Sequence, residues 1–350
     1  MRKELDQTSK SILALVKGNS ELSSSDIHSR LETDVQLVTT KRNLSKLVAE
    51  NLLSTTGVGR GTRYIISPSY KLFYPIDIEV YFEKEIDNRE IINRFNQALL
   101  DEVLEDVQLF SNEENEQLNA LQENYKKTIN NLPKSIYQND LERLAIDLSW
   151  KSSQIEDNTY SLLETEALLL EQKEAEGKDK DDATMLLNHK EAIDFLIKEP
   201  EYIYPLSLAK IESIHSILIN NLGVERNIRR RHVGITGTNY VPLDNEFQIK
   251  EAVIQMCILV NERRNIFEKA LLLLVLISYI QPFSDGNKRT ARIISNAILI
   301  NHGYCPLSFR TVDSVYYKKT MLLFYEQNNI EGFKAIFMDQ YKFAVNTYFK

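Results

Sequence analysis

The longest apolar run in the chain lies at residues 270–280, where eleven consecutive residues are almost free of polar atoms. This run is too short to cross a bilayer, which needs about 20 apolar residues, but it has the length of a buried helix. Pro282 then breaks the helical pattern, and a second segment with apolar residues at helical intervals follows at 291–300. The pattern therefore predicts two packed helices joined by a short polar loop.

The first 70 residues have a different pattern. Apolar residues recur at helical intervals over 9–17, 25–31 and 38–50, which predicts three short helices. A glycine-rich basic turn at 56–63 then precedes a strand. Three helices followed by a hairpin resemble a winged helix-turn-helix domain, an α+β fold that we expect over residues 1–70.

In such a domain the third helix and the wing contact DNA. The candidate contacts are polar and basic side chains of the third helix and of the glycine-rich turn: Thr40, Lys41, Arg42, Lys46, Arg60 and Arg63. Residues 1–68 hold ten Lys and Arg against seven Asp and Glu, a net charge of +3, whereas the remaining residues carry −11. The positive net charge of this region suits phosphate contacts, but the charge is small, and winged helices also bind proteins. Duplex DNA and a protein partner therefore both stay open.

Residues 71–145 show helical periodicity with mixed charge, as at 99–109 and 116–129, and we interpret them as a helical connector. The charged run at 171–182 is typical of a solvated loop. Aromatic residues at helical spacing over 307–349 indicate packing rather than ligand stacking. Beyond the N-terminal domain, the sequence thus predicts a mainly α-helical fold.

The loop between the two central helices gathers groups that bind polyphosphate. Gly286 and Asn287 begin the second helix, so their backbone N–H groups point toward an anion. Arg289 and Arg292 lie three residues apart on one helix face and can each form paired hydrogen bonds with phosphate. Asp285 supplies the hard oxygen ligand that phosphate-bound Mg²⁺ prefers. Together these groups predict a nucleotide or polyphosphate site.

The stretch from 281 to 292 resembles the signature of Fic proteins, His-x-Phe-x-(Asp/Glu)-Gly-Asn-(Gly/Lys)-Arg-x-x-Arg, at every defined position except the first. The resemblance implies a Fic-type helical bundle that transfers AMP from ATP, with Mg²⁺, to a hydroxyl of a protein target or of the chain itself. It also implies roles for the matching residues: Asp285 for the metal, Gly286 and Asn287 for the anion hole, and Lys288, Arg289 and Arg292 for the phosphates.

Gln281 stands where the family has the histidine that deprotonates the target hydroxyl. Glutamine can hydrogen-bond to that hydroxyl but cannot accept its proton near neutral pH, and loss of a general base costs about 10²–10⁴-fold in rate. Weak or vestigial adenylyl transfer and a catalytically inactive, ATP-responsive regulator of DNA or protein binding therefore both stay open. Phosphoryl transfer is a third alternative, because the Lys288 variant also occurs in the Doc-type kinases of this family. Arg292 argues against it, since it resembles the adenylyl-transferring members.

The seven residues that begin at Ser152 (SSQIEDN) resemble the inhibitory segment of Fic proteins, (Ser/Thr)-x-x-x-Glu-(Gly/Asn), with Asp157 departing at the last place. The resemblance implies an inhibitory helix around residues 150–165, in which Glu156 pairs with Arg292 and blocks productive ATP binding. A carboxylate there competes with the nucleotide for the same guanidinium. The alternative is an ordinary helix start, because Ser-x-x-x-Glu is close to a capping box.

Residues 230–243 contain two glycines and several β-branched residues, which predicts a short hairpin between helices. By resemblance to Fic proteins, this hairpin is a flap that holds the target backbone by strand addition. The expected docking residues form its tip and outgoing strand: Thr236, Gly237, Thr238, Asn239 and Tyr240.

Length and composition set wider limits. At 350 residues the chain can hold two or three domains, and we expect the Fic domain over 146–350. Cys257 and Cys305 are too few for a disulfide framework, and no run predicts a signal peptide or a membrane span, so a cytoplasmic location is expected. No histidine is paired at helical spacing with a carboxylate ligand set, so no zinc site is predicted. The oligomeric state stays open, a homodimer included.

Overall fold

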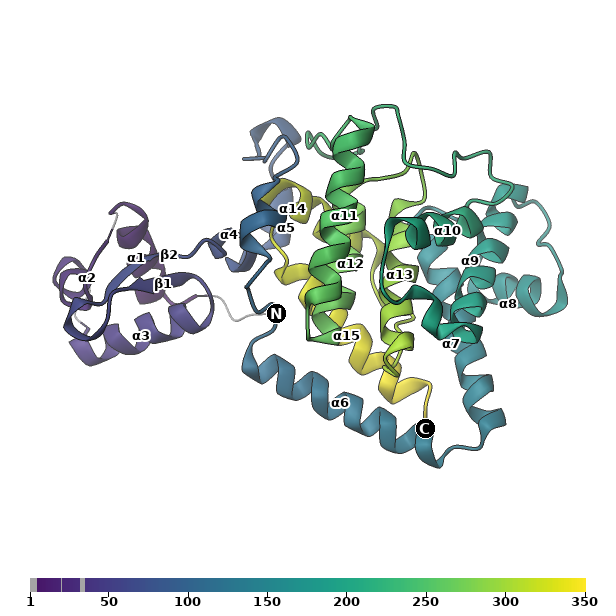
Figure 1. Cartoon of the computed structure of the whole chain (residues 1–350), viewed down its shortest axis with the longest axis horizontal. Coiled ribbons are helices and arrows are strands. Elements are labelled where there is room, and N and C mark those ends of the chain that lie inside the picture. The colour runs from purple at the N-terminus through teal and green to yellow at the C-terminus, as the bar shows by residue number, and fades with distance from the viewer. Residues whose placement is uncertain (1–4, 20, 32–34) are drawn as a thin grey trace.

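The structure, a computed structural model, describes residues 5–19, 21–31 and 35–350. Figure 1 shows a small N-terminal unit beside a larger bundle of helices. The fold is mainly helical, as the sequence predicts, and the described residues contain one two-stranded sheet. No helix in the described part of the chain is long and apolar enough to pass through a bilayer.

The N-terminal unit consists of three helices and an antiparallel hairpin. Their bounds are α1 Gln7–Lys17, α2 Ser24–Arg30, α3 Leu37–Ala49, β1 Leu53–Thr56 and β2 Arg63–Ile66. Ile12 and Leu44 are fully buried in the core of this unit. Leu53 pairs with Ile66 in the hairpin. The three helices and the hairpin therefore lie where the apolar pattern predicts them.

Short segments of the connector lead from this unit into the bundle. They are α4 Tyr70–Phe73, α5 Ile78–Phe82, a 3-10 turn at Ile86–Asn88 and a π-helical turn at Leu99–Val103. Asn329 Nδ2 donates to Lys71 O at 3.0 Å and to Tyr74 O at 2.7 Å. These bonds fix the start of the connector against the C-terminal part of the bundle.

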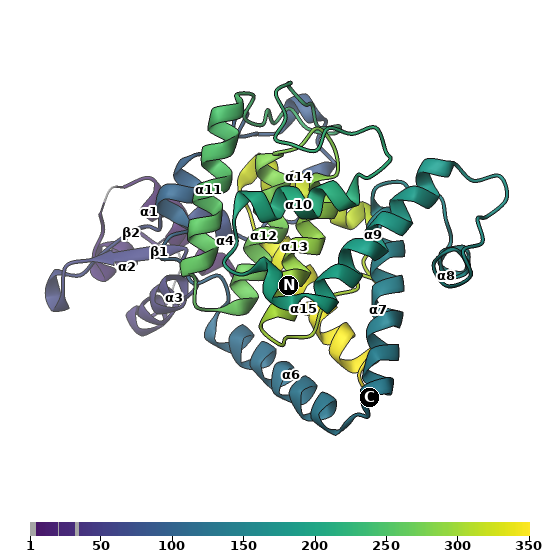
Figure 2. The same ribbon diagram turned by 45° about the vertical axis from the view of Figure 1, so that its right-hand side comes forward.

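The longer helices form the bundle, in which α12 and α13 pack as an antiparallel pair with the other helices around them (Figure 2). Their bounds are α6 Asn112–Asn131, α7 Lys134–Ile155, α8 Leu162–Glu171, α9 Lys180–Lys198, α10 Leu208–Leu218, α11 Glu246–Glu262, α12 Ile266–Ile280, α13 Asn287–Asn301, α14 Ser314–Gln327 and α15 Glu331–Thr347. Every side chain of α12 from 267 to 280 is buried. The long apolar run in the sequence is therefore the central helix of the core.

The helix predicted at 99–109 is wrong beyond its first turn. Only Leu99–Val103 is helical, and the backbone that follows bonds to buried side chains of another segment. Arg263 Nη1 donates to Val107 O at 2.6 Å, and Glu268 Oε1 accepts from Leu109 N–H at 2.7 Å. These tertiary bonds satisfy backbone groups that a continued helix would have paired internally.

The Ser-x-x-x-Glu segment ends a helix rather than starting one. α7 runs from Lys134 through Ile155, and Glu156 is its C-cap residue, so the helix expected around 150–165 is instead the last turn of α7. The capping-box alternative is wrong for this segment. A true capping box starts α8, where Ser161 and Glu164 bond to each other's backbone N–H groups.

Candidate nucleotide-binding site

The loop between α12 and α13 makes two tight turns. α12 ends at Gln281, which adopts a left-handed conformation with φ 53°, and Gly286 with φ 78° precedes α13. Phe283 is fully buried, and its ring stacks on that of His215 of α10 at 3.6 Å between centroids. His215 Nε2 also lies 3.0 Å from Asp285 O. This histidine therefore fixes the loop on the bundle.

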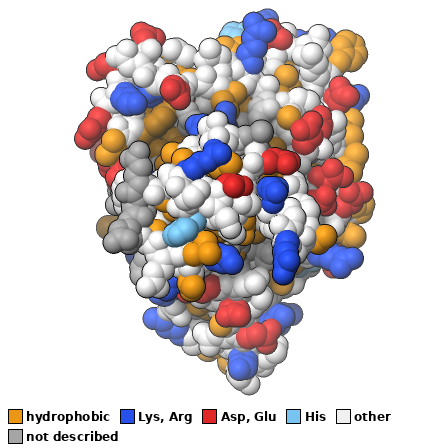
Figure 3. All heavy atoms as spheres, turned by 90° about the vertical axis from the view of Figure 1, so that its left-hand side faces the viewer, with side chains coloured by type: hydrophobic (Ala, Val, Ile, Leu, Met, Phe, Trp, Pro, Cys, Tyr) orange, Lys and Arg blue, Asp and Glu red, His pale blue; other side chains and the backbone are white. Residues whose placement is uncertain are grey.

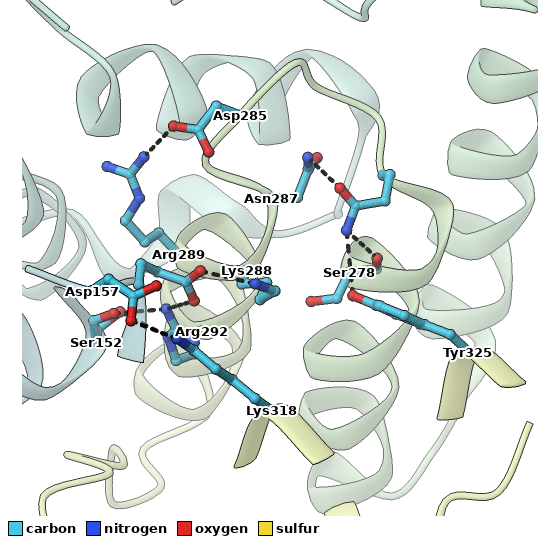
Figure 4. Close-up of polar contacts among 12 residues, drawn as sticks. Ser152, Asp157, Ser278, Asp285, Asn287, Lys288, Arg289, Arg292, Lys318 and Tyr325 are labelled. Atoms are coloured by element: carbon cyan, nitrogen blue, oxygen red, sulfur yellow. Dashed lines mark hydrogen bonds and ion pairs between the residues drawn. The ribbon is translucent and has the colours of Figure 1, made fainter. Parts of the chain in front are cut away.

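Asn287 closes the loop from inside. Its Oδ1 accepts from Phe283 N–H at 2.9 Å, and its Nδ2 donates to Phe283 O at 2.8 Å and to Gln281 Oε1 at 2.9 Å. Gln281 Nε2 in turn donates to Ser278 O at 2.7 Å and to Tyr325 Oη at 3.3 Å (Figure 4). The Gln281 amide is thus held in one orientation, with room for one more hydrogen bond at its oxygen.

A cavity of about 440 Å³ lies in front of this loop. Its lining comes from the loop, the end of α7, the flap segment and α14: Glu156, Asp157, Val233, Gly234, Ile235, Thr236, Gln281, Ser284, Asp285, Gly286, Asn287, Lys288, Arg289, Lys318, Met321, Leu322 and Tyr325. Gly286 provides no side-chain cap for the first N–H groups of α13. The helix N-terminus therefore offers its positive dipole end and unpaired donors to the cavity.

Two arginines of α13 lie under the cavity. Arg289 is buried and donates from Nη2 to Asp285 Oδ2 at 2.9 Å. Arg292 is fully buried and donates from Nε to Ser152 Oγ and from Nη2 to Ser152 O, both at 2.8 Å. Nη1 of each guanidinium is buried and makes no hydrogen bond of regular geometry to a described residue, although the guanidinium of Arg292 lies 5.3 Å from the centroid of the Tyr317 ring. Buried donors of this kind are costly unless a ligand or water binds them, which points to an anion.

Glu156 reaches the same helix from the end of α7. Its Oε1 accepts from Arg292 Nη2 at 2.8 Å and its Oε2 from Lys288 Nζ at 3.0 Å (Figure 4). Burial raises the pKa of Glu156, but the charges of Arg292 and Lys288 outweigh it and lower the pKa to about 2. The carboxylate is therefore ionised near neutral pH and acts as an internal counter-ion for both cations.

Asp157 and Lys318 form a further ion pair at the edge of the cavity. Lys318 Nζ of α14 lies 2.7 Å from Asp157 Oδ1. Asp157 has φ 69°, a conformation that favours glycine or asparagine, the residues that the resemblance places there. Sequence reasoning missed Lys318 and Tyr325, because they come from α14, far along the chain, and carry no motif.

The predicted site residues of the loop, α13 and α7 are thus brought together, and the cations that line the cavity or lie beneath it are already paired. Lys288 and Arg292 bind Glu156, Arg289 binds Asp285, and Lys318 binds Asp157. In this state three carboxylates occupy the neighbourhood in which phosphate groups are expected. Binding of a nucleotide would replace one set of anions by another.

The flap segment at 230–243 reverses at Thr236 and Gly237, as a hairpin does. It has no ladder between its own limbs in the described structure; instead Val241 forms a single parallel bridge with Arg94. Among the expected docking residues, Thr238 and Tyr240 are buried, whereas Thr236, Gly237 and Asn239 are exposed. Two of the five residues are therefore not available to a target, because they pack against the bundle.

The donor set around Asp285 fits a magnesium ion only with a nucleotide present. No group of three or more His, Cys, Asp or Glu side chains in the described part of the chain is arranged to hold a metal. Asp285 is two-thirds exposed at its side chain and offers one carboxylate beside the anion site. Mg²⁺ is commonly bound by one or two carboxylates together with substrate phosphates, so this arrangement fits a phosphate-bound ion.

Comparison with known proteins agrees with this geometry. Residues 205–299, which hold the flap segment, the loop and nearly all of α13, match the sequence model of the Fic/DOC family. Residues 205–299 are therefore similar in sequence to a Fic domain. A protein adenylyltransferase Fic from Nematostella vectensis is 29% identical over 171 residues, which cover 47% of this chain and 39% of that protein. The chain therefore spans well under half the length of this curated relative.

Solved structures of two Fic proteins share the fold of about two thirds of this chain. A fragment of Fic-1 from C. elegans superposes with a TM-score of 0.59 at 18% identity, covering 67% of this chain and 71% of that one. A Fic domain-containing signaling protein from Bacteroides thetaiotaomicron gives a TM-score of 0.55 at 17% identity, covering 66% and 96%. At these identities the likeness concerns the fold.

The DNA-contact candidates lie on the N-terminal unit, away from the cavity. Lys41, Arg42 and Lys46 are exposed on α3, and Arg60 is exposed in the turn between β1 and β2. Thr40 is buried, and its Oγ1 lies 3.2 Å from His28 Nδ1, so its prediction as a DNA contact is wrong. Arg63 is half-buried. Figure 3 shows basic and acidic side chains interspersed on this side of the molecule rather than a continuous basic surface.

Proposed function

We propose that this chain is a nucleotide-dependent regulator whose Fic domain binds ATP and transfers AMP weakly to a protein hydroxyl. The observation that carries the proposal is the uncapped N-terminus of α13 in a cavity lined by three paired cations, with the paired Arg292 and buried, unpartnered guanidinium nitrogens beneath it. Such a site binds a polyanion of several phosphate groups. The relative from Nematostella vectensis, named as a protein adenylyltransferase, supports the choice of AMP transfer.

In the proposed reaction, Lys288 and Arg289 bind the phosphate groups, and the N–H groups of Gly286 and Asn287 stabilise their charge. Asp285 would hold Mg²⁺, which supplies charge neutralisation on the phosphates. The hydroxyl oxygen of the target bonds to the α-phosphorus, the bond between the α- and β-phosphates breaks, and pyrophosphate leaves. Gln281 Oε1 can accept a hydrogen bond from that hydroxyl, but the proton goes to solvent.

Glu156 restrains this reaction in the proposal. While it binds Arg292 and Lys288, those two cations are unavailable to the distal phosphates. Productive binding of ATP requires the end of α7 to release Arg292, which also bonds to Ser152 Oγ and Ser152 O. Transfer is therefore limited at two successive steps, the pose of the nucleotide and the removal of the proton.

A second function, a catalytically inactive regulator in which ATP governs binding to DNA or a partner, is favoured by one observation. Three hydrogen bonds, from Asn287 and to Ser278 and Tyr325, hold the Gln281 amide in the wall of the cavity. In this reading the residues 1–70 form a winged helix that carries the output. The order of three helices and a hairpin, with exposed basic residues on α3, supports that assignment.

Labelled ATP distinguishes the two functions. We expect little incorporation from α-labelled ATP in the wild type and in Gln281→His alone, more in Glu156→Gly, and much more in the double variant, because it satisfies both steps. Restoring a base should add about 10²–10⁴-fold once Glu156 is gone. Glu174→Gly, which removes an exposed carboxylate outside the cavity, is the control.

Calorimetry with ATP on the wild type, the two single variants and the double variant shows whether a lack of label reflects a lack of ATP binding. A double variant that binds ATP but incorporates no α-label would favour the inactive regulator. Incorporation from γ-labelled ATP instead would indicate phosphoryl transfer. Absence of any ATP binding to Glu156→Gly would contradict both readings of the cavity.

A further inference from the structure

The four residues at 156–159, here called the strap, follow α7 and contact three other helices. Glu156, at one end, binds two cations of α13. Thr159, at the other end, donates to Asp182 Oδ2 in the first turn of α9, from its N–H at 3.0 Å and from Oγ1 at 2.6 Å. Asn158 Nδ2 donates to Asp182 O at 2.9 Å. The strap is therefore held at one end by α13 and at the other by α9.

The third helix, α14, binds the strap between these ends. Lys318 Nζ lies 2.7 Å from Asp157 Oδ1, and both residues line the cavity (Figure 4). Neither side chain forms another ion pair with a described residue. Tyr317 and Met321 of the same helix are buried in the bundle, so Lys318 extends from an element that is fixed by packing. The ion pair therefore fastens the strap to a rigid part of the protein.

The backbone of the strap explains only part of the residue choice at position 157. Asp157 has φ 69°, a conformation that also suits glycine and asparagine. The turn therefore requires a residue that tolerates a positive φ, but it does not require a negative charge. The inhibitory signature of Fic proteins has an uncharged residue, glycine or asparagine, at this place. The charge of Asp157 is thus a feature of this chain, and Lys318 is the group that it binds.

We infer that Asp157 is a positioning residue, which binds Lys318 and thereby keeps the neighbouring Glu156 on Arg292 and Lys288. The inference rests on the proposed function, because it deepens the restraint by Glu156. The Asp157 side chain is 84% exposed and that of Lys318 36% exposed, so their ion pair is weak and is screened by salt. The Arg292 side chain is fully buried, so its contact with Glu156 is screened much less. The exposed pair therefore adjusts how often the strap opens.

Hydrogen exchange of the whole chain tests whether the ion pair holds the strap. In Asp157→Asn, which keeps the shape of the side chain and suits the positive φ, the amides of 156–159 should exchange about two- to fivefold faster than in the wild type. Lys318→Met should have the same effect, and Lys318→Arg should not. In about 1 M salt the wild type and Asp157→Asn should exchange equally. Equal exchange of these two proteins at low salt would overturn the inference.

Glu79→Gln is the matched control. Glu79 of α5 binds Lys319, the next residue of α14, and the two ion pairs are similarly exposed, with 67% for the Glu79 side chain and 27% for that of Lys319. Neither of these residues lines the nucleotide cavity. Removal of this carboxylate should leave exchange at 156–159 unchanged. The same acceleration in Glu79→Gln as in Asp157→Asn would show a general effect of lost charge on α14, and would contradict the positioning role.

Calorimetry with ATP tests whether Asp157 acts through Glu156. The double variant Asp157→Asn/Lys318→Met loses one charge of each sign, so the net charge around the cavity stays the same. It should bind ATP about two- to fivefold more tightly than the wild type, because Glu156 leaves Arg292 more readily.

The same double change in a Glu156→Gly background should not tighten ATP binding, since the restrained carboxylate is absent. An equal increase in both backgrounds, or no increase in the wild-type background, would overturn the link to Glu156. If Glu156→Gly itself binds no ATP, the proposed function fails, and the exchange experiment alone decides whether Asp157 holds the strap.

Discussion

Under the proposed function, Glu156 is the residue whose ionisation and contacts most directly control what the cavity binds. It is the shared partner of Arg292 and Lys288, and its own backbone ends α7. A bound phosphate group would need the same donors, so competition between an internal and an external anion is built into these three side chains. The strength of that competition depends on the ionisation of one carboxyl group.

The contact of Glu156 with Arg292 and Lys288 should be insensitive to pH near neutrality. The pKa of Glu156 is lowered from 4.5 to about 2, so its contribution to stability is full above about 4.5 and is lost as the pH falls toward about 2. The ratio of ATP dissociation constants for wild type and Glu156→Gln should therefore be constant from about pH 5 to about pH 8. Titration of ATP itself cancels in this ratio. A ratio that changes within this range would show that the pKa lies well above about 2.

At the residue scale, the sequence predicted the groups of the motif but not their partners. Arg292 and Glu156 could be paired only through resemblance to a family, since they lie 136 positions apart and no periodicity relates α7 to α13. Lys318 and His215 carried no signal at all: a lysine and a histidine on separate helices have no spacing rule that would assign them to this loop. Their roles follow from helix packing, which a local pattern does not contain.

The loop between α12 and α13 depends on glycine at one position. A Cβ on Gly286 would lie 3.2 Å from Ile219 Cγ2 and 3.4 Å from His215 Nε2, in addition to the cost of φ 78°. Gly303 also has positive φ, at 69°, but nothing lies within 4 Å of its would-be Cβ. An alanine at Gly303 would therefore add only the conformational cost of a positive φ, whereas an alanine at Gly286 would add that cost and a steric clash.

Chemical denaturation of the two alanine variants measures this difference. Gly303→Ala should lower the free energy of unfolding by about 1 kcal/mol, the cost of a left-handed alanine. Gly286→Ala should lower it by roughly 1 kcal/mol more, because His215 or Ile219 must move. It should also weaken ATP binding, since the N–H groups beside Gly286 shift with it. Equal losses in the two variants would show that the loop adapts without strain.

At the element scale, prediction succeeded where one pattern determined one structure. The run at 270–280 became α12 because an almost wholly apolar helix has to be buried, and the three short amphipathic helices of the N-terminal unit formed for the same reason. It failed at 104–109, where Arg263 and Glu268 replace helical hydrogen bonds. In the flap, the limb expected to pair within a hairpin pairs with the connector instead.

At the scale of the whole molecule, α14 is the helix that contacts the cavity, the flap and the connector. It contributes Lys318 and Tyr325 to the cavity and Lys319 to an ion pair with Glu79 of α5. Its Glu326 binds Arg89, which also donates to Gly237 O of the flap. Because α5 belongs to the connector, one helix contacts the cavity, the flap and the segment that leads to the N-terminal unit. A displacement of α14 would therefore alter contacts in the cavity, in the flap and in the connector.

The whole chain should bind duplex DNA weakly and with strong salt dependence if the N-terminal unit is a winged helix that contacts phosphates. Lys41→Ala/Arg42→Ala should reduce the slope of log affinity against log salt by about 2, near 0.9 for each phosphate that is no longer neutralised. Lys126→Ala/Lys127→Ala, an adjacent basic pair exposed on α6, is the control with the same change in charge. Gel-shift titrations on genomic fragments measure both, and no shift at low salt would favour a protein partner.

The backbone conformation at Gln281 determines which residues can replace it during evolution without a change in the turn. Its φ of 53° lies in a region where few residues other than glycine occur, and histidine is among those enriched there. The turn at the end of α12 thus already has a shape that suits the residue of the Fic signature. Under the proposed function, a single substitution that leaves the turn unchanged separates a domain that only holds a nucleotide from one that also removes a proton. Under that proposal, descendants of this protein could gain or lose proton removal through one substitution at position 281, with the fold unchanged.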